Sequence, residues 1–282
     1  MVAVFPVSAI DPTHAVEREV AVQPLLQPLG PRLLRWIRQI GGRKPAAESP
    51  DVGYPGIDER SVLYVVGDIH GRSDLLDRIF KAINRNRLMD PDKRALEIYL
   101  GDYVDRGPDS AGVIARLRKR ASRRPVRLLL GNHEAMFMDF LGGKSEHSWL
   151  ENGGMATAFS YGVDPWLGPD LREALIRAIP PEDLTFLNSL RPSFRYGPYF
   201  FVHAGIRPNR TIEDQSLDDL IWIRKEFLDH AGPFGPIVVH GHTPNAEPEF
   251  RPNRINLDTG AFATNRLTCL RIDKNGPVLL PN

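Results

Sequence analysis

The segment Gly101-Asp102-Tyr103-Val104-Asp105-Arg106-Gly107 decides the fold that this sequence of 282 residues predicts. It follows the mainly apolar run at 96–100, whose length and composition predict a buried strand. The segment then presents two carboxylates and a guanidinium group, which are rarely buried unless another group pairs them. A strand that ends at a glycine and continues into such residues indicates a functional site at the end of a sheet.

The same pattern, a short apolar run followed by a polar loop, occurs four more times. The runs lie at 61–66, 126–130, 200–202 and 237–239. The loops after them contain Gly67-Asp68-Ile69-His70-Gly71, Gly131-Asn132-His133-Glu134, His203-Ala204-Gly205 and His240-Gly241-His242-Thr243. Open α/β sheets bind ligands outside the carboxyl ends of their strands, so we expect these loops to converge. Their oxygen and imidazole groups, without a thiolate, suit a pair of divalent cations such as Mn²⁺, Fe²⁺ or Zn²⁺.

The motifs GDIHG, GDYVDRG, GNHE, HAG and HGHT, in this order, resemble the metallophosphoesterase superfamily. Within it they are most similar to the phosphoprotein phosphatase branch, in its bacterial serine/threonine phosphatase form. The motifs extend from Gly67 to Thr243, and the apolar pattern continues the likeness to about Asp273. The resemblance implies an αββα sandwich of two mixed β-sheets flanked by helices. The sequence alone predicts only an α/β protein with a β-rich second half.

The resemblance also implies a dinuclear site, with Mn²⁺ as the expected metal and Fe or Zn as alternatives. The implied metal ligands are Asp68, His70, Asp102, Asn132, His203 and His242. Asp102 is the expected bridge between the two ions. The implied reaction is hydrolysis of a phosphomonoester by direct attack of a hydroxide that the two metals share, without a phospho-enzyme. Pro244 stands where the wider superfamily has a further histidine ligand, and this departure fits the phosphoprotein phosphatase branch.

The remaining motif residues have other implied roles. His133 is expected to protonate the leaving oxygen while Asp105 holds its ring, as general acid catalysis requires. Arg106 and Arg224, with Asn132, are the expected phosphate-binding residues, since a planar guanidinium group suits phosphate. Glu134 is expected to begin a helix, where its charge suits the N-terminus.

Domain organisation follows from composition. Residues 1–56 are proline-rich and predict an extension and linker, with one amphipathic helix at 32–40 that could pack on the domain or dock a partner. Residues 57–282 are the expected catalytic domain, with a helical insertion at 141–192.

Helices are expected at 72–87, 110–120 and from Glu134 onward, with Ser73 as the cap of the first. A single helix is expected at 218–230. Two late strands, at 254–257 and 267–272, are expected to run antiparallel. His240 is expected to orient a metal ligand.

Overall charge and cysteine content restrict the function. A formal net charge of +1 provides no general field that would attract nucleic acid or a membrane surface. No apolar stretch approaches the ~20 residues of a membrane span, and no secretory signal is apparent. The lone cysteine, Cys269, excludes an internal disulfide framework, lies outside every motif and fits a reducing compartment. We therefore expect a cytoplasmic protein.

Three functions remain open at this point. The expected substrate is phosphoserine or phosphothreonine in a protein, with phosphotyrosine as a further option. A dinucleoside polyphosphate hydrolase, such as one that cleaves diadenosine tetraphosphate, would share the same motifs. A metal-binding regulatory protein that has lost catalysis is the alternative from another class, but the sequence retains His133, Asp105 and Arg106.

Overall fold

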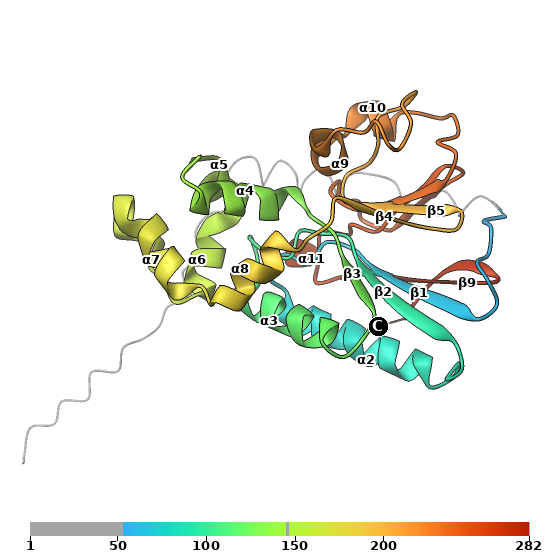
Figure 1. Cartoon of the computed structure of the whole chain (residues 1–282), viewed down its shortest axis with the longest axis horizontal. Helices are drawn as coiled ribbons and strands as arrows, with labels where there is room; N and C mark the ends of the chain where they lie inside the picture. The colour runs from blue at the N-terminus through green and yellow to red at the C-terminus, as the bar shows by residue number, and fades with distance from the viewer. Residues whose placement is uncertain (1–52, 145–146, 282) are drawn as a thin grey trace, which may run out of the picture.

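A computed structural model describes residues 53–144 and 147–281 (Figure 1). Two five-stranded sheets pack face to face, and helices cover the outer face of each sheet. The expected αββα sandwich is therefore confirmed. Except for residues 53–56, the predicted extension at 1–56 and its helix at 32–40 lie outside the described residues, so the domain division stays a prediction. Among the described residues, no helix has the length and apolar character needed to cross a membrane.

The first sheet has the strand order β10-β9-β1-β2-β3. Its strands are β1 (Ser61–Val66), β2 (Arg94–Tyr99), β3 (Val126–Leu128), β9 (Cys269–Asp273) and β10 (Gly276–Leu279). The parallel strands β1, β2 and β3 alternate in sequence with α2 (Ser73–Arg87) and α3 (Ser110–Ala121), as right-handed crossover units require. These two helices lie along the outer face of the sheet (Figure 1).

The second sheet has the strand order β4-β5-β6-β8-β7. Its strands are β4 (Ser193–Tyr196), β5 (Tyr199–Val202), β6 (Ile237–His240), β7 (Glu249–Arg251) and β8 (Arg254–Asn256). The helices α9 (Leu217–Trp222) and α10 (Lys225–Leu228) cover its outer face (Figure 1). The short helix α11 (Ala261–Thr264) follows β8 before the chain returns to the first sheet.

Side-chain alternation along the central strands explains why the two sheets pack against each other. Along β1, Val62 and Tyr64 face the helical layer, whereas Leu63 and Val65 face the second sheet. All six residues of β1 are buried, so the strand has an apolar surface on both faces. Such strands need a covering layer on each side, and the sandwich supplies both.

The predicted insertion is helical throughout most of its length. After α4 (Asn132–Leu141) the chain forms short helices and turns that lie together at one end of the sandwich (Figure 1). These are α5 (His147–Trp149), the π-type turn η1 (Leu150–Gly154), α6 (Met155–Ser160), the 3-10 turn η2 (Pro165–Asp170), α7 (Leu171–Ala178) and α8 (Pro181–Asn188).

Several local predictions are wrong. Ser73 does not cap α2: it is the first helical residue, and its hydroxyl donates to Asp109 Oδ2 at 2.5 Å instead. The expected helix at 218–230 is two helices, because Ile223 adopts an extended ψ of 140° and ends α9. The strand expected at 126–130 ends at Leu128, and Leu129 then pairs with Arg191.

The two late strands also differ from the prediction. β8 and β9 do not pair with each other, because they belong to different sheets. β8 runs parallel to β6 and antiparallel to β7, whereas β9 is antiparallel to both β1 and β10. The chain between β8 and β9 therefore crosses from one sheet to the other and links the two halves of the sandwich.

Candidate dinuclear metal site

The five motif loops converge at the carboxyl ends of the parallel strands. The backbone N–H groups of Ile69 and His70 both donate to the carbonyl of Asp102, at 3.0 and 2.8 Å. In the second sheet, the N–H of Gly241 donates to the carbonyl of His203 at 2.8 Å. These bonds join neighbouring loops of the same sheet. Because the two sheets pack face to face, the loops of one sheet lie close to the loops of the other.

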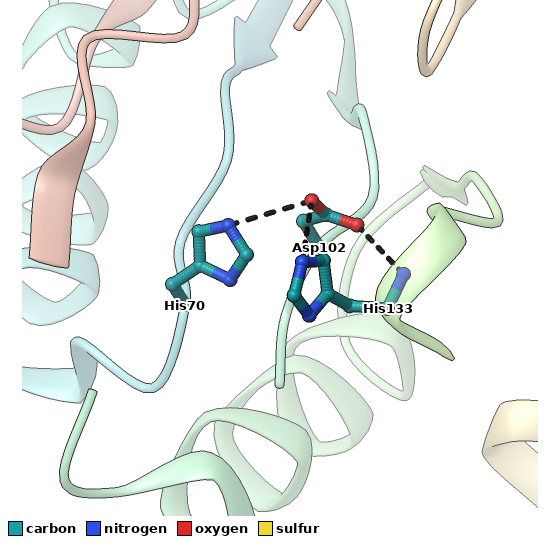
Figure 2. Close-up of side chains that lie close together, drawn as sticks. All are labelled: His70, Asp102 and His133. Atoms are coloured by element: carbon teal, nitrogen blue, oxygen red, sulfur yellow. Dashed lines mark hydrogen bonds and ion pairs between the residues drawn. The ribbon is translucent and has the colours of Figure 1, made fainter. Parts of the chain in front are cut away.

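Asp102 lies at the centre of the convergence (Figure 2). Its Oδ2 is 3.4 Å from His70 Nε2, and its Oδ1 is 3.3 Å from His203 Nε2. The backbone N–H of His133 donates to Oδ1 at 3.1 Å. One oxygen of this carboxylate thus faces an imidazole from the first sheet, and the other oxygen faces an imidazole from the second. A ligand that bridges two metal ions would need this arrangement. Two groups of potential metal ligands share Asp102.

The orientation of His70 and His203 is fixed by backbone carbonyls. His70 Nδ1 lies 2.9 Å from the carbonyl of Val104, and His203 Nδ1 lies 2.9 Å from that of Leu100. A carbonyl only accepts, so Nδ1 carries the proton in both rings and Nε2 keeps its lone pair. Both Nε2 atoms lie within 3.4 Å of the Asp102 carboxylate, where they could bind a cation together with it.

In the second group of ligands, His203 Nε2 lies among acceptor oxygens. His203 Nε2 faces Asn132 Oδ1 at 2.9 Å as well as the Asp102 carboxylate. His242 Nδ1 lies 2.8 Å from the same Asn132 oxygen and 3.2 Å from His203 Nε2. Because His203 Nε2 has no proton to give, its contacts with two oxygens are unfavourable by themselves, and a cation among these atoms would make them favourable.

Two buried atoms provide a second test of whether the residues fit a metal. Asp68 Oδ1 and His242 Nε2 find no hydrogen-bond partner among the described residues. Asp68 Oδ2, in contrast, accepts the backbone N–H of His242 at 2.9 Å. An unpaired buried carboxylate oxygen is costly, so Asp68 Oδ1 needs a partner that residues 53–144 and 147–281 do not supply. The donor set of carboxylates, imidazoles and an amide oxygen fits a divalent cation.

Burial keeps the imidazoles neutral, which is the form that binds metal. Burial, with the nearby Arg106 charge, lowers the pKa of His70 to about 3, and burial also holds the pKa of His242 well below its usual range. Burial and the neighbouring carboxylates of Asp258 and Asp102 raise the pKa of Asp68 well above its usual range. Bound cations would relieve this repulsion among carboxylates.

His133 and Asp105 form a close pair beside Asp102. His133 Nδ1 lies 2.7 Å from Asp105 Oδ2, and both side chains are fully buried. His133 Nε2 lies 3.9 Å from Asp102 Oδ2 and faces the centre of the site (Figure 2). Burial raises the pKa of Asp105 to about 8 and lowers that of His133 well below its usual value.

The two arginines predicted to bind phosphate lie differently. Arg106 is an exposed residue whose Nη1 contacts His70 Nε2 at 2.9 Å, and its guanidinium lies 5.1 Å from the ring centre of Phe262. Arg224 caps α10 at the break between α9 and α10, and its Nη1 donates to Thr243 Oγ1 at 3.3 Å. Arg106 therefore reaches the ligand cluster directly, whereas Arg224 lies beside the loop of His242.

The site is also where the backbone is most strained. Only a few non-glycine residues adopt a positive φ, and such conformations cost free energy at functional sites. Five of the seven described here lie in the motif loops, with φ from 46° to 69°: His70, Asp102, Asp105, Arg106 and His242.

Two carboxylates have roles that the sequence did not predict. Glu134 lies in the first turn of α4, as expected, but it is fully buried and accepts N–H groups from the backbone of two motif loops. Asp258 is also buried, and burial raises its pKa to about 6 while the Asp102 charge adds to the rise. The sequence held a signal for Asp258, because it follows the strand expected at 254–257 just as the ligands follow their strands.

His240 has no hydrogen bond to a candidate ligand among the described residues. Its Nδ1 contacts the carbonyl of Gly241 at 3.1 Å, its Nε2 lies 3.4 Å from Arg254 Nη1, and its ring packs against Phe227. The expectation that it orients a ligand stays a prediction. The ring serves the packing between β6 and α10.

The fold and this cluster define a metal-dependent hydrolase of phosphoesters. The chain belongs to the calcineurin-like phosphoesterase family, whose model matches residues 62–271. The family uses two divalent metals, and the two ligand groups around Asp102 could hold them.

Relatives carry two different activities in their names. The chain is 30% identical over 220 residues to serine/threonine-protein phosphatase 1 of Salmonella typhimurium, covering 74% of this chain and 91% of that protein. It is 25% identical over 237 residues to the asymmetrical bis(5'-nucleosyl)-tetraphosphatase PrpE of Halalkalibacterium halodurans, covering 77% and 93%. The crystal structure of a candidate diadenosine tetraphosphatase shares the fold, with a TM-score of 0.56 at 21% identity, over 81% of this chain and 99% of that one.

Proposed function

We propose that the protein is a dinuclear-metal phosphatase that hydrolyses phosphoserine and phosphothreonine in proteins, with phosphotyrosine as a further substrate. One observation carries the proposal. The His133–Asp105 pair, joined at 2.7 Å, lies beside a carboxylate whose two oxygens face His70 and His203. A proton donor and a candidate metal bridge thus share one centre, as hydrolysis of a phosphomonoester needs.

In this proposal each ligand has a defined place. Asp68 and His70 would hold one cation and Asn132, His203 and His242 the other, with Asp102 shared between them. Mn²⁺ is the metal we propose. When bound, the two cations would lower the pKa of a water molecule and neutralise the phosphoryl oxygens.

The chain itself would orient the phosphate and supply the proton. The exposed guanidinium of Arg106 would leave His70 and bind phosphate oxygens, and Arg224 would close from the other side. His133 would give the proton at Nε2 to the leaving oxygen. Asp105, which accepts from Nδ1, would stabilise the ring while it is positively charged.

The proposed substrate class comes from the relatives of this chain. The more similar of the two reported relatives bears the name of a serine/threonine-protein phosphatase, and this chain spans 91% of its length. The second candidate function is hydrolysis of dinucleoside polyphosphates, which the name of the PrpE relative suggests. We propose the cytoplasm as its location and residues 57–282 as its catalytic domain.

Parallel assays on the full chain would test the proposal. Manganese-loaded protein is expected to release phosphate from a phosphoserine peptide and from para-nitrophenyl phosphate, and the His133→Asn variant is the control for contaminating activity. Cleavage of diadenosine tetraphosphate alone would replace the first candidate with the second. A protein that bound manganese but cleaved none of the three substrates would be a catalytically silent metal-binding protein.

A further inference from the structure

The carboxylate of Asp105 has three hydrogen-bond partners, and two of them come from the helical insertion. Its Oδ2 accepts from His133, while its Oδ1 accepts from Trp149 Nε1 at 3.0 Å and from Thr157 Oγ1 at 2.7 Å. Trp149, Thr157 and Asp105 are each 0% exposed. The insertion therefore contacts the proton-donating pair through the Asp105 oxygen that does not face His133.

We propose that Trp149 and Thr157 are positioning residues for the His133–Asp105 pair. They would fix the Asp105 carboxylate so that only Oδ2 faces the imidazole. The inference rests on the proposed function, because it concerns the proton that His133 gives to the leaving oxygen. The proposal gives the helical insertion, which lies at one end of the sandwich, a part in proton transfer.

The backbone around Asp105 supports this assignment. Asp105 and Arg106 both have a φ of 69°, a conformation that non-glycine residues adopt only when their surroundings hold them. The N–H of Asp105 donates to Thr157 Oγ1 at 2.9 Å, and the N–H of Arg106 donates to the carbonyl of Gly153 at 3.2 Å. Residues of the insertion thus hold the strained backbone as well as the carboxylate.

The hydroxyl of Thr157 is held in one orientation by its partners. It accepts from the backbone N–H of Asp105 and donates to the carboxylate of the same residue. Ser110 Oγ, 3.0 Å away, completes the hydrogen bonding of this buried hydroxyl. A valine at this position would keep the volume but remove both bonds to Asp105.

The indole of Trp149 is equally constrained. Its ring stacks on Phe137 and Phe140, with ring centres 4.9 and 4.4 Å away. Gly154 packs so closely behind it that an added Cβ would lie 2.3 Å from the ring. The N–H therefore has a fixed direction, and a phenylalanine would keep an aromatic ring in this stack while losing the bond to Asp105.

The hydrogen bonds from Thr157 and Trp149 also affect the charge of the Asp105 carboxylate. Burial raises the pKa of Asp105, whereas the hydrogen bonds from Thr157 and Trp149 act to lower it. They favour the ionised carboxylate, which is the form that can hold a proton on the neighbouring imidazole.

Substrates that differ in leaving group separate this role from a merely structural one. A serine alkoxide leaves only if it is protonated, whereas para-nitrophenolate is stable without a proton. For Trp149→Phe and Thr157→Val, kcat/KM on a phosphoserine peptide is expected to fall about 10- to 100-fold, as expected for loss of a hydrogen bond to a charged group. On para-nitrophenyl phosphate it is expected to fall less than about threefold.

Matched variants control the comparison. Thr157→Ser keeps the hydroxyl and is expected to retain the wild-type ratio of the two activities. Tyr161→Phe removes a different, partly buried hydrogen bond of the same insertion, to Asp183 at 3.1 Å, and is expected to leave the ratio unchanged. Manganese content and melting temperature, measured on each variant, would show whether the site and the fold persist. An equal fall on both substrates in the two test variants would overturn the inference.

A measurement without substrate keeps this inference separate from the proposed function. In the zinc-loaded protein, which is diamagnetic, proton NMR is expected to show a downfield Nδ1 proton that is absent from His133→Asn. The Trp149→Phe/Thr157→Val double variant is expected to shift or lose this signal. An unchanged signal would overturn the inference even if the wild-type protein dephosphorylates peptides. Inactivity of the wild-type protein toward all phosphate esters would instead refute the proposed function.

Discussion

Replacement of Glu134 by glutamine tests how the site is held together. The Oε2 atom of this buried carboxylate accepts the backbone N–H groups of Asp102 at 2.9 Å and Gly131 at 3.0 Å. The Oε1 atom accepts those of Tyr103 at 2.6 Å and Val104 at 3.1 Å. One side chain thus joins the loops after β2 and β3, including the backbone of the proposed bridging ligand.

The size of the expected effect follows from these four bonds. A glutamine has one acceptor oxygen, so its NH₂ group would face two backbone donors that have no other acceptor nearby. Each buried unsatisfied donor costs about 1–3 kcal/mol, which gives a destabilisation of about 2–6 kcal/mol. This is a large share of the ~5–15 kcal/mol by which a domain is usually stable.

Urea unfolding of the metal-free protein at about pH 9, where the carboxylate is ionised, would measure the change. Burial and the Asp102 charge raise the pKa of Glu134 to about 8, so a lower pH would understate the effect. Glu173→Gln is the matched control, because it removes an exposed first-turn charge from α7. The control is expected to cost less than about 1 kcal/mol. If Glu134→Gln cost no more than the control, the side chain would serve only the helix N-terminus, and our account of the loops would be wrong.

Three further predictions concern the centre itself. Asp102→Asn is expected to remove bound manganese and activity together, which metal analysis and a phosphatase assay would check; full occupancy would refute its role as the shared ligand. His133→Asn is expected to keep the metal but lower kcat by a factor on the order of 10²–10⁴, and loss of metal would show that His133 is itself a ligand. For the metal-free protein, the raised pKa values of Asp105 and Glu134, each about 8, mean that the folded state binds more protons than the unfolded state. Unfolded histidines are neutral above about pH 7.5, so the two acids dominate there. Stability should therefore fall as pH rises from about 7.5 to 9, on the order of 1 kcal/mol per pH unit, and saturating manganese should suppress the fall; stability that rises in this window would contradict the pKa shifts.

The sequence predicted the positions of the ligand loops because each one follows a short apolar strand directly. The signal is local: the carboxylate or histidine comes within a few residues of the strand end, and parallel strands bring such ends together. The structure accordingly gathers Asp68, His70, Asp102, Asn132 and the two histidines of the second sheet in one place. The pairing of His133 with Asp105 was implied by the family resemblance alone, and the structure brings the two side chains to 2.7 Å.

Interactions between distant parts of the chain could not be predicted in this way. Trp149 lies 44 residues from Asp105 in sequence, and the hydrogen bond between them depends on how the insertion folds back. Glu134 looks like an ordinary first-turn acid, and only the three-dimensional structure shows its four backbone partners. The break between α9 and α10 was missed for a related reason. The helical spacing of apolar residues continues through Ile223, but the backbone leaves the helical conformation there.

The distribution of the ligands between the two sheets gives the proposed metals a structural role. Asp68, His70 and Asp102 follow strands of the first sheet, whereas His203 and His242 follow strands of the second. The apolar interface between the sheets is continuous along the strands, but at their carboxyl ends it gives way to buried carboxylates and imidazoles. Hydrophobic burial cannot join the sheets at that end, and the repulsion between carboxylates opposes their approach. Cations bound between the two sets of ligands would replace this repulsion by attraction. The ions proposed to take part in hydrolysis would therefore also hold the two sheets together at the carboxyl ends of their strands.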